Sequence, residues 1–247
     1  MIEAVLFDGD QTLWDFERVM RQALAAVLDE LRLARPGPAA DALTIADLYD
    51  DRDTVAHELA GIEFNLAQLR RLGFARTLQR LTGGASSGET DGEAGADDEA
   101  LAATLSASYF DHRDREPALF DDTLPCLEAL APHYRLGLLS NGSRLPERIG
   151  LGGIFEAVVF AQDHRVAKPD RGIFAVVEKE MGIEPAQAVL VGDHPLNDVV
   201  GAKRSGWRAV WIDRKGEAPY AAPTGCAEEP DAVITSLDQL AKVLATF

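Results

Sequence analysis

The sequence is poor in cysteine and in long apolar runs. Only Cys126 and Cys226 occur among its 247 residues. Two cysteines are too few for a disulfide framework, and such usage is typical of a reducing compartment. No apolar run approaches the ~20 residues that span a bilayer, and the stretch MIEAVLFDGD lacks the basic start of a signal peptide. We therefore expect a cytoplasmic protein that does not bind membranes.

Positive charge is also scarce, with 24 Lys and Arg against 41 Asp and Glu and a formal net charge of −17. Such a surface repels polyanions, so we expect no nucleic-acid polymer among its partners. The patterns GxxxxGK[ST] and GxGxxG do not occur, which disfavours a Walker-type NTPase and a dinucleotide enzyme. The expected oligomeric state is a monomer or a homodimer.

Short apolar runs of strand length are present and dominate the second half of the chain. They are Ala4–Phe7, Leu136–Leu139, Val158–Phe160, Val189–Val191, Ala209–Ile212 and the weaker Ala232–Ile234. Runs without polar alternation are typical of parallel strands that are covered on both faces. Helical patterns separate or follow the later runs, at Asp122–Leu130, Ile173–Met181, Asn197–Ser205 and Leu237–Leu244. The alternation predicts an α/β protein with a doubly wound parallel sheet.

A long stretch between the first and second runs reads as almost wholly helical. Helices are predicted at Phe16–Leu33, Ile45–Leu59, Leu66–Leu81 and Leu101–Asp111. We interpret residues 15–115 as an all-helical domain inserted into an α/β core domain of residues 1–14 and 116–247. Within the insertion, residues 83–99 are rich in Gly, Ser and acidic residues without an apolar anchor, so a mobile loop is predicted there.

Side chains suited to phosphate and metal chemistry lie where the predicted strands end, or in the loops that follow them. They are Asp8 and Asp10 after the first run, Ser140 and Asn141 after the second, Lys168 in the loop VAKPD, and Asp193 and Asp198 after VLVG. In open parallel sheets, ligands bind at the carboxyl edge of the strands. Because these residues combine carboxylates, a hydroxyl and an ammonium group, they predict a phosphate and Mg²⁺ site at that edge.

The residue types suggest a mechanism. Mg²⁺ prefers oxygen ligands and binds few carboxylates, which Asp8, Asp193 and Asp198 can supply, with the backbone carbonyl of Asp10 as a further oxygen. A carboxylate beside a phosphoryl group can attack it to form an aspartyl-phosphate, and a metal offsets the repulsion between the two anions. We predict Asp8 as the nucleophile, Asp10 as the general acid and base, and Lys168 as a positive charge on the transferring phosphoryl group.

The segment after the second run is predicted to bind phosphate. Ser140 can donate a hydroxyl hydrogen bond, and backbone N–H groups from Asn141 onward can cradle phosphate at the start of the next helix. Lys168 joins them as a phosphate-binding residue.

Four motifs resemble those of the haloacid dehalogenase superfamily, in the same order: FDGDQTL, LLSNG, the lysine of AKPD, and VGDHPLND. The resemblance implies a Rossmann-like core, a mobile helical cap inserted after the first motif, Mg²⁺, and the roles assigned above. Two positions depart from the usual pattern. Arg171 stands where a proline is common, and Gly9 is smaller than the usual residue, so either a looser turn or free space is expected there.

The resemblance also indicates the reaction. Dehalogenases of this superfamily lack the second aspartate, because a departing halide needs no proton, so Asp10 favours a phosphatase. The expected function is hydrolysis of small phosphomonoesters, such as nucleotides or sugar phosphates, through an aspartyl-phosphate. Two alternatives stay open: a phosphomutase of the same family, and a phospho-accepting receiver protein in signalling. The first-strand nucleophile and the helical insertion disfavour the receiver.

Other residues are candidates for substrate contact. In and beside the insertion these are Trp14, Phe16, Arg18, Arg21, Asn65, Arg70 and Arg71. For Arg144, contact with substrate and contact with water are both open, and His194 is interpreted as a solvated loop residue.

Overall fold

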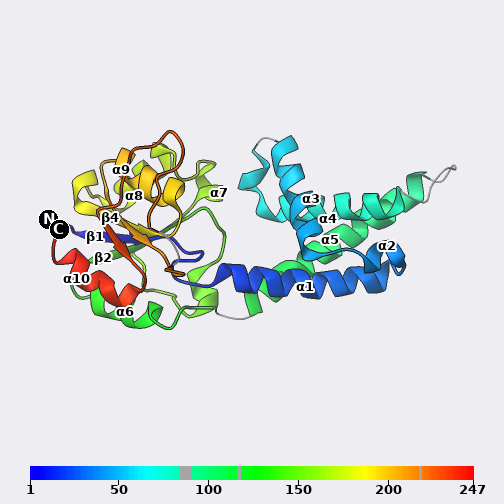
Figure 1. Cartoon of the computed structure of the whole chain (residues 1–247), viewed down its shortest axis with the longest axis horizontal. Coiled ribbons are helices and arrows are strands. Elements are labelled where there is room, and N and C mark those ends of the chain that lie inside the picture. The colour runs from blue at the N-terminus through cyan, green and yellow to red at the C-terminus, as the bar shows by residue number, and fades with distance from the viewer. Residues whose placement is uncertain (60, 84–90, 116–117, 217–218) are drawn as a thin grey trace. The chain divides into compact units, whose positions relative to one another are not determined.

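The computed structural model describes residues 1–59, 61–83, 91–115, 118–216 and 219–247. They form two compact units, Met1–Glu17 with Pro117–Phe247, and Arg18–Glu116, and each is described by itself. Figure 1 shows a strand-containing unit and a helical unit. Across the described ranges, every helix falls short of the length or the apolarity that a bilayer crossing requires.

The first unit is built on a six-stranded sheet in the order β3-β2-β1-β4-β5-β6. Its strands are β1 (Ala4–Phe7), β2 (Arg135–Ser140), β3 (Ala157–Phe160), β4 (Ala188–Gly192), β5 (Arg208–Ile212) and β6 (Ala232–Ile234). Every neighbouring pair is parallel. The doubly wound parallel sheet is confirmed, and each apolar run forms the strand predicted for it.

The two faces of the sheet build two separate cores. Successive side chains of a strand point to opposite faces, so Val5 and Phe7 of β1 enter one core while Ala4 and Leu6 enter the other. Helices α6 (Thr123–Leu130) and α10 (Leu240–Leu244) pack on the first core, and α8 (Arg171–Met181) and α9 (Gly201–Arg204) on the second. Figure 1 shows these two helix pairs on opposite sides of the sheet. Because both faces are covered, the strands are apolar except at their ends, where Arg135, Ser140 and Arg208 lie.

Shorter helical turns complete the unit. They are η2 (Pro146–Ile149), α7 (Ala161–His164), η3 (Pro185–Gln187), the π-helical η4 (Pro195–Val200) and η5 (Leu237–Gln239). The single helix predicted over Asn197–Ser205 is wrong in one respect. Its first part is wound as a π-helix, and only the last part is α-helical.

The strand order places a switch point at β1. This strand pairs with β2 on one side and with β4 on the other, so the loops that leave the carboxyl ends of β1 and β4 start side by side. In doubly wound sheets, the crevice at such a point is where ligands bind.

The two places where the chain leaves and rejoins the sheet unit are tied together. Trp14 forms an antiparallel bridge with Leu119, and the Asp15 N–H donates to the Ala118 carbonyl at 2.8 Å. The Thr123 hydroxyl donates to the Leu13 carbonyl at 2.6 Å. The insertion therefore begins and ends at neighbouring points of the core.

The second unit is helical over its described residues. Its elements are α1 (Phe16–Ala34), which begins at the boundary, α2 (Pro38–Asp41), α3 (Ile45–Glu58), η1 (Ile62–Phe64), α4 (Leu66–Thr82) and α5 (Asp91–Arg115). Its main core joins an apolar stripe of α1, including Leu24 and Leu31, to Phe74 of α4 and Leu105 of α5. The loop predicted over 83–99 is too long, because residues 91–99 belong to α5. Residues 84–90 of that prediction lie outside the described residues.

Asp122, the residue before α6, ties three parts of the sheet unit together. Its Oδ2 accepts hydrogen bonds from Arg214 (2.5 Å), the Ser236 hydroxyl (2.9 Å) and the Leu237 N–H (2.8 Å). Arg214 also donates to the Thr12 carbonyl at 2.5 Å. Burial acts to raise the pKa of Asp122, but these hydrogen bonds outweigh it and hold the pKa below its usual value.

We predict that Asp122→Asn lowers the free energy of unfolding at pH 7 by about 1.5–3 kcal/mol, the usual range for a hydrogen bond to a charged group. A carboxyl with a lowered pKa stabilises the fold above its unfolded pKa, and this contribution is lost as pH falls through the folded pKa. The deficit, measured by denaturant unfolding, should therefore shrink below about pH 4. Glu128→Gln, an exposed site on the same helix, is the control and should change little. An unchanged deficit at low pH would contradict the charge-based account.

Candidate active site

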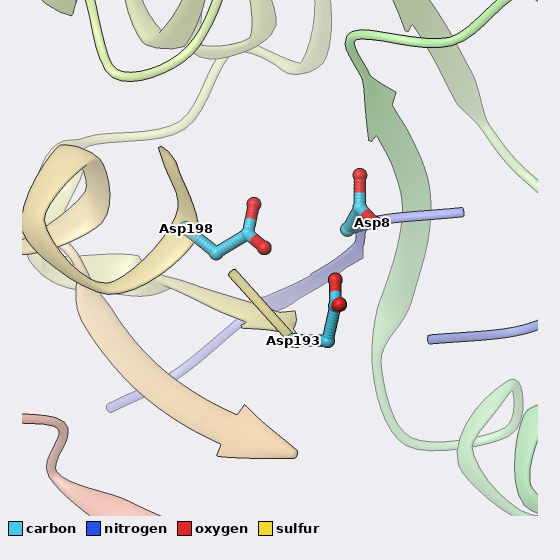
Figure 2. A group of neighbouring side chains, drawn as sticks. All are labelled: Asp8, Asp193 and Asp198. Atoms are coloured by element: carbon cyan, nitrogen blue, oxygen red, sulfur yellow. The ribbon is translucent and has the colours of Figure 1, made fainter. Parts of the chain in front are cut away.

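Three carboxylates converge at the carboxyl edge of the sheet. Asp8 directly follows β1, Asp193 directly follows β4, and Asp198 lies in the π-helical turn η4. One oxygen of each lies within 4.8 Å of the others, and Figure 2 shows the three side chains facing a shared space. The structure thus brings Asp8 together with Asp193 and Asp198, which lie at the other end of the sequence, and all three were predicted to share a metal site.

Lys168 lies between two of these carboxylates. Its Nζ donates to Asp8 Oδ1 at 2.6 Å and to Asp198 Oδ1 at 2.7 Å, and its side chain is 1% exposed. Asn141 holds the Lys168 backbone from both sides: the Lys168 N–H donates to Asn141 Oδ1 at 2.9 Å, and Asn141 Nδ2 donates to the Lys168 carbonyl at 3.0 Å. The side chain of Asn141 therefore fixes the lysine loop, a role that the sequence analysis missed.

Burial and mutual repulsion govern the charges of this group. Burial raises the pKa of Asp8; Lys168 acts against this shift, and Asp198 and Asp193 add to it. Burial and the nearby Asp198 raise the pKa of Asp193 to about 7. Burial acts to lower the pKa of Lys168, but Asp198 and Asp8 outweigh it, so the pKa is raised and the ammonium stays charged.

The donor set fits a hard divalent cation. Three carboxylates face a single ammonium group, so negative charge exceeds positive charge in a buried place. All the offered ligand atoms are carboxylate oxygens, the type that Mg²⁺ and Ca²⁺ prefer. A divalent cation would offset the repulsion that raises the pKa values of Asp8 and Asp193.

The local sequence after β4 explains how Asp198 reaches the site. A Cβ at Gly192 would lie 2.3 Å from the Asp198 carboxyl group, so only glycine leaves room for it. The His194 N–H donates to Asp198 Oδ2 at 2.9 Å. His194 is an exposed loop residue, as predicted, and its Nδ1 also accepts from the Leu196 and Asn197 N–H groups and caps η4.

A tryptophan of β5 supports the backbone of Asp193. Trp211 Nε1 donates to the backbone carbonyl of Asp193 at 2.6 Å. The indole is 9% exposed and belongs to the core shared with α8 and α9. Sequence patterns predict Trp211 as a core residue of a strand and carry no signal for this contact.

Asp10 is not one of the three grouped carboxylates, but it acts on them: burial is the main cause of the raised pKa values of Asp8 and Asp193, and the charge of Asp10 adds to it. The Oδ1 of Asp10 accepts a hydrogen bond from Trp14 Nε1 at 2.6 Å. Trp14, a candidate for substrate contact, is 1% exposed and lies in the sheet core.

The segment after β2 differs from the prediction. Ser140 is the buried last residue of β2, and its Oγ accepts from the Gly142 N–H at 3.0 Å. The helix expected to start there is absent from the described residues. Residues 141–145 are non-helical, and the next turn is the short η2. Arg144 is 2% exposed, so the alternative in which it faces bulk water is also wrong.

Comparison with known proteins identifies the family. The model of the haloacid dehalogenase-like hydrolases matches residues 2–206. A phosphoserine phosphatase of Thermus thermophilus is 35% identical over 48% of this chain, which spans 51% of that protein. A glyceraldehyde 3-phosphate phosphatase of Methanopyrus kandleri is 29% identical over 94% of this chain and 92% of its own length.

A solved structure extends the likeness to the whole fold. The crystal structure of a 2-haloacid dehalogenase from Pseudomonas syringae pv. Tomato DC3000 aligns with a TM-score of 0.78 and 30% identity, over 100% of this chain and 99% of the other. The family model, the sequence relatives and this structure agree with the four motifs and with the parallel sheet. The chain belongs to the haloacid dehalogenase-like hydrolases, and its curated relatives above are named phosphatases.

Proposed function

We propose that this protein is a Mg²⁺-dependent phosphatase of small phosphomonoesters that acts through an aspartyl-phosphate on Asp8. The observation that carries the proposal is the placement of Asp8. It combines a hydrogen bond from Lys168 (2.6 Å) with a position in the three-carboxylate group at the switch point of the sheet.

In this proposal, Asp8 attacks the phosphorus atom and the leaving group departs on the opposite side. Lys168 orients the attacking carboxylate through its hydrogen bond to Oδ1 and places positive charge beside the transferring oxygens. Asp10 protonates the leaving oxygen and later takes a proton from the water that attacks the aspartyl-phosphate.

The residues after β2 complete the proposed phosphate site. Ser140 contributes its hydroxyl at the carboxyl end of the strand. Asn141 keeps Lys168 in place through the two backbone contacts described above, and in this proposal its own N–H donates to phosphate.

Asp8, Asp193 and Asp198 would hold the Mg²⁺ ion, together with the backbone carbonyl of Asp10. When bound, the cation supplies positive charge that lowers the repulsion between Asp8 and an anionic substrate. The carboxyl pKa values support this assignment, because both Asp8 and Asp193 are poor acids without such a charge.

The relatives suggest the substrate class. The two named above act on phosphoserine and on glyceraldehyde 3-phosphate, as their names say. Both are small phosphomonoesters, but the alcohol that carries the phosphate differs between them. We therefore propose small phosphomonoesters as the substrate class and name no single compound. Phosphate release from a panel of phosphorylated metabolites with Mg²⁺ tests this.

Haloacid hydrolysis is the second candidate, because a dehalogenase is among the solved structures that align along the whole chain. Halide release from 2-chloropropionate, measured beside phosphate release, separates the two. A halide leaves without a proton and would make no use of Asp10. Halide release without phosphate release would overturn the phosphatase proposal.

We predict that Asp8→Asn abolishes phosphate release, with a loss of at least about 10³-fold, because the amide cannot serve as the nucleophile. The matched control is Asp163→Asn, a carboxylate of α7 outside the three-carboxylate group. Wild-type protein should also form an acid-stable, hydroxylamine-sensitive phosphoryl adduct that the Asp8 variant lacks. Retained turnover in Asp8→Asn would contradict the proposed nucleophile.

We predict that the stabilisation by Mg²⁺ increases with pH. Asp193 has a folded pKa of about 7, above its unfolded value, so the stabilising contribution of this one group in the metal-free fold is present at low pH and is lost as pH rises from about 4 to 7. Mg²⁺ requires ionised ligands, so its effect grows over the same range. Thermal unfolding with and without Mg²⁺ at pH 5.5 and 7.5 measures this. Asp193→Asn should lose most of the Mg²⁺ effect, and a pH-independent effect would contradict the assignment.

A further inference from the structure

The indole of Trp14 lies directly over Gly9. A Cβ at position 9 would lie 2.2 Å from Trp14 Cζ2 and 2.4 Å from Cη2, distances that real Cβ contacts do not reach. Any larger residue at position 9 would therefore displace the ring. Of the two alternatives expected at this glycine, free space is wrong, because Trp14 fills it.

The backbone between the two residues is wound tightly. The Leu13 and Trp14 N–H groups donate to the Gly9 carbonyl at 2.9 and 3.3 Å, and the Gln11 N–H donates to the Trp14 carbonyl at 2.8 Å. Gln11 adopts a left-handed φ of 60°. The loop thus holds Trp14 at a set place relative to Asp10, which lies within it.

The hydrogen bond from Trp14 distinguishes the two oxygens of Asp10. An indole N–H only donates, so Asp10 Oδ1, 2.6 Å away, must accept. A carbonyl oxygen is a better acceptor than a hydroxyl oxygen, so this bond favours placing the acid proton of Asp10 on Oδ2. Oδ2 lies toward the segment after β2, because it is 2.7 Å from the point where a Cβ of Gly142 would be, and Ser140 Oγ is 3.2 Å from the same point.

We propose that Trp14, seated on Gly9, is a positioning residue that directs Oδ2 of Asp10 to the leaving group. This inference rests on the proposed function, in which Asp10 is the acid and base. As the Asp8–phosphorus bond forms and the phosphorus–oxygen bond to the leaving group breaks, the Oδ2 proton passes to that oxygen and yields an alcohol. Attack of water on the aspartyl-phosphate then returns a proton to Oδ2 and releases phosphate and Asp8.

The test compares two substrates that differ in their need for a proton. A primary alkyl phosphate must have its leaving oxygen protonated, whereas p-nitrophenolate leaves as a stable anion. The quantity measured is kcat/KM, which reports the steps up to the release of the leaving group and excludes the later hydrolysis. Asp10→Asn provides the reference, with an expected loss of about 10²–10⁴-fold on the alkyl ester and a much smaller loss on the aryl ester.

We predict that Trp14→Phe, which keeps an aromatic ring but removes the N–H, lowers kcat/KM about 10- to 100-fold for the alkyl phosphate, as misplacement of a catalytic group does. The loss should be below about 3-fold for the aryl phosphate, because transfer to that leaving group needs no acid. Trp207→Phe is the matched control. It removes an indole N–H that donates to Glu178 at 2.7 Å, in the core shared with α8 and α9, and it should show no dependence on the leaving group.

Gly9→Ala tests whether the packing of the Trp14 indole against Gly9 is required. It should reproduce the pattern of Trp14→Phe, and the loss in the double variant should be clearly smaller than the sum of the two single effects in free energy, because both changes act on one contact. Binding of beryllofluoride with Mg²⁺, which involves Asp8 without proton transfer, should stay as tight as in the wild type and shows that the variants keep a folded site.

Equal losses on both esters, or no loss on either, would overturn the role of Trp14. The proposed function fails separately, through activity that persists in Asp8→Asn. A third outcome would refute the role of Trp14 and leave the proposed function intact. In it, Asp8→Asn is inactive and Asp10→Asn loses more activity on the alkyl than on the aryl ester, but Trp14→Phe shows no such difference.

Discussion

The structure of the site depends on placing several carboxylates in one buried location. Asp8, Asp193 and Asp198 lie within a few ångströms of one another, and Lys168 is the ammonium group that bonds two of them. Burial makes each negative charge costly. The raised pKa values of Asp8 and Asp193 follow from this, as does the fit to a hard divalent cation. Binding of a further positive charge at this group of carboxylates is therefore strongly favoured.

Holding such a cluster together requires contacts beyond the charged groups. Asn141 fixes the backbone of Lys168, and Trp211 holds the backbone of Asp193. Gly192 provides the space that the Asp198 carboxyl group occupies. These contacts link the ends of β2, β4 and β5 to the loops that carry the charges, so the sheet itself sets the geometry of the site.

The strands, and the edge of the sheet where the site lies, could be predicted because each is indicated by a short stretch of neighbouring residues. Fully buried parallel strands read as apolar runs, and Asp8 and Asp193 directly follow two of them, so β1 and β4 indicate where these carboxylates lie. Contacts between distant segments carry no such signal. The amide of Asn141 bonding the Lys168 backbone and the indole of Trp14 bonding Asp10 depend on side-chain directions that periodicity does not encode. The helix expected after Ser140 failed for a related reason, since motif order does not determine where the next turn begins.

The bridge between Trp14 and Leu119 affects which part of the protein can change in length during evolution. The chain leaves and rejoins the sheet unit at this one bridge. The entropy cost of joining the two ends of the inserted segment rises only slowly with its length, so a long insertion costs little more than a somewhat shorter one. Helices can be lengthened, shortened or exchanged between those ends while the strands keep their register. Such a junction makes the inserted unit the part of this protein most open to replacement, and the aspartate-bearing edge the part least open to it.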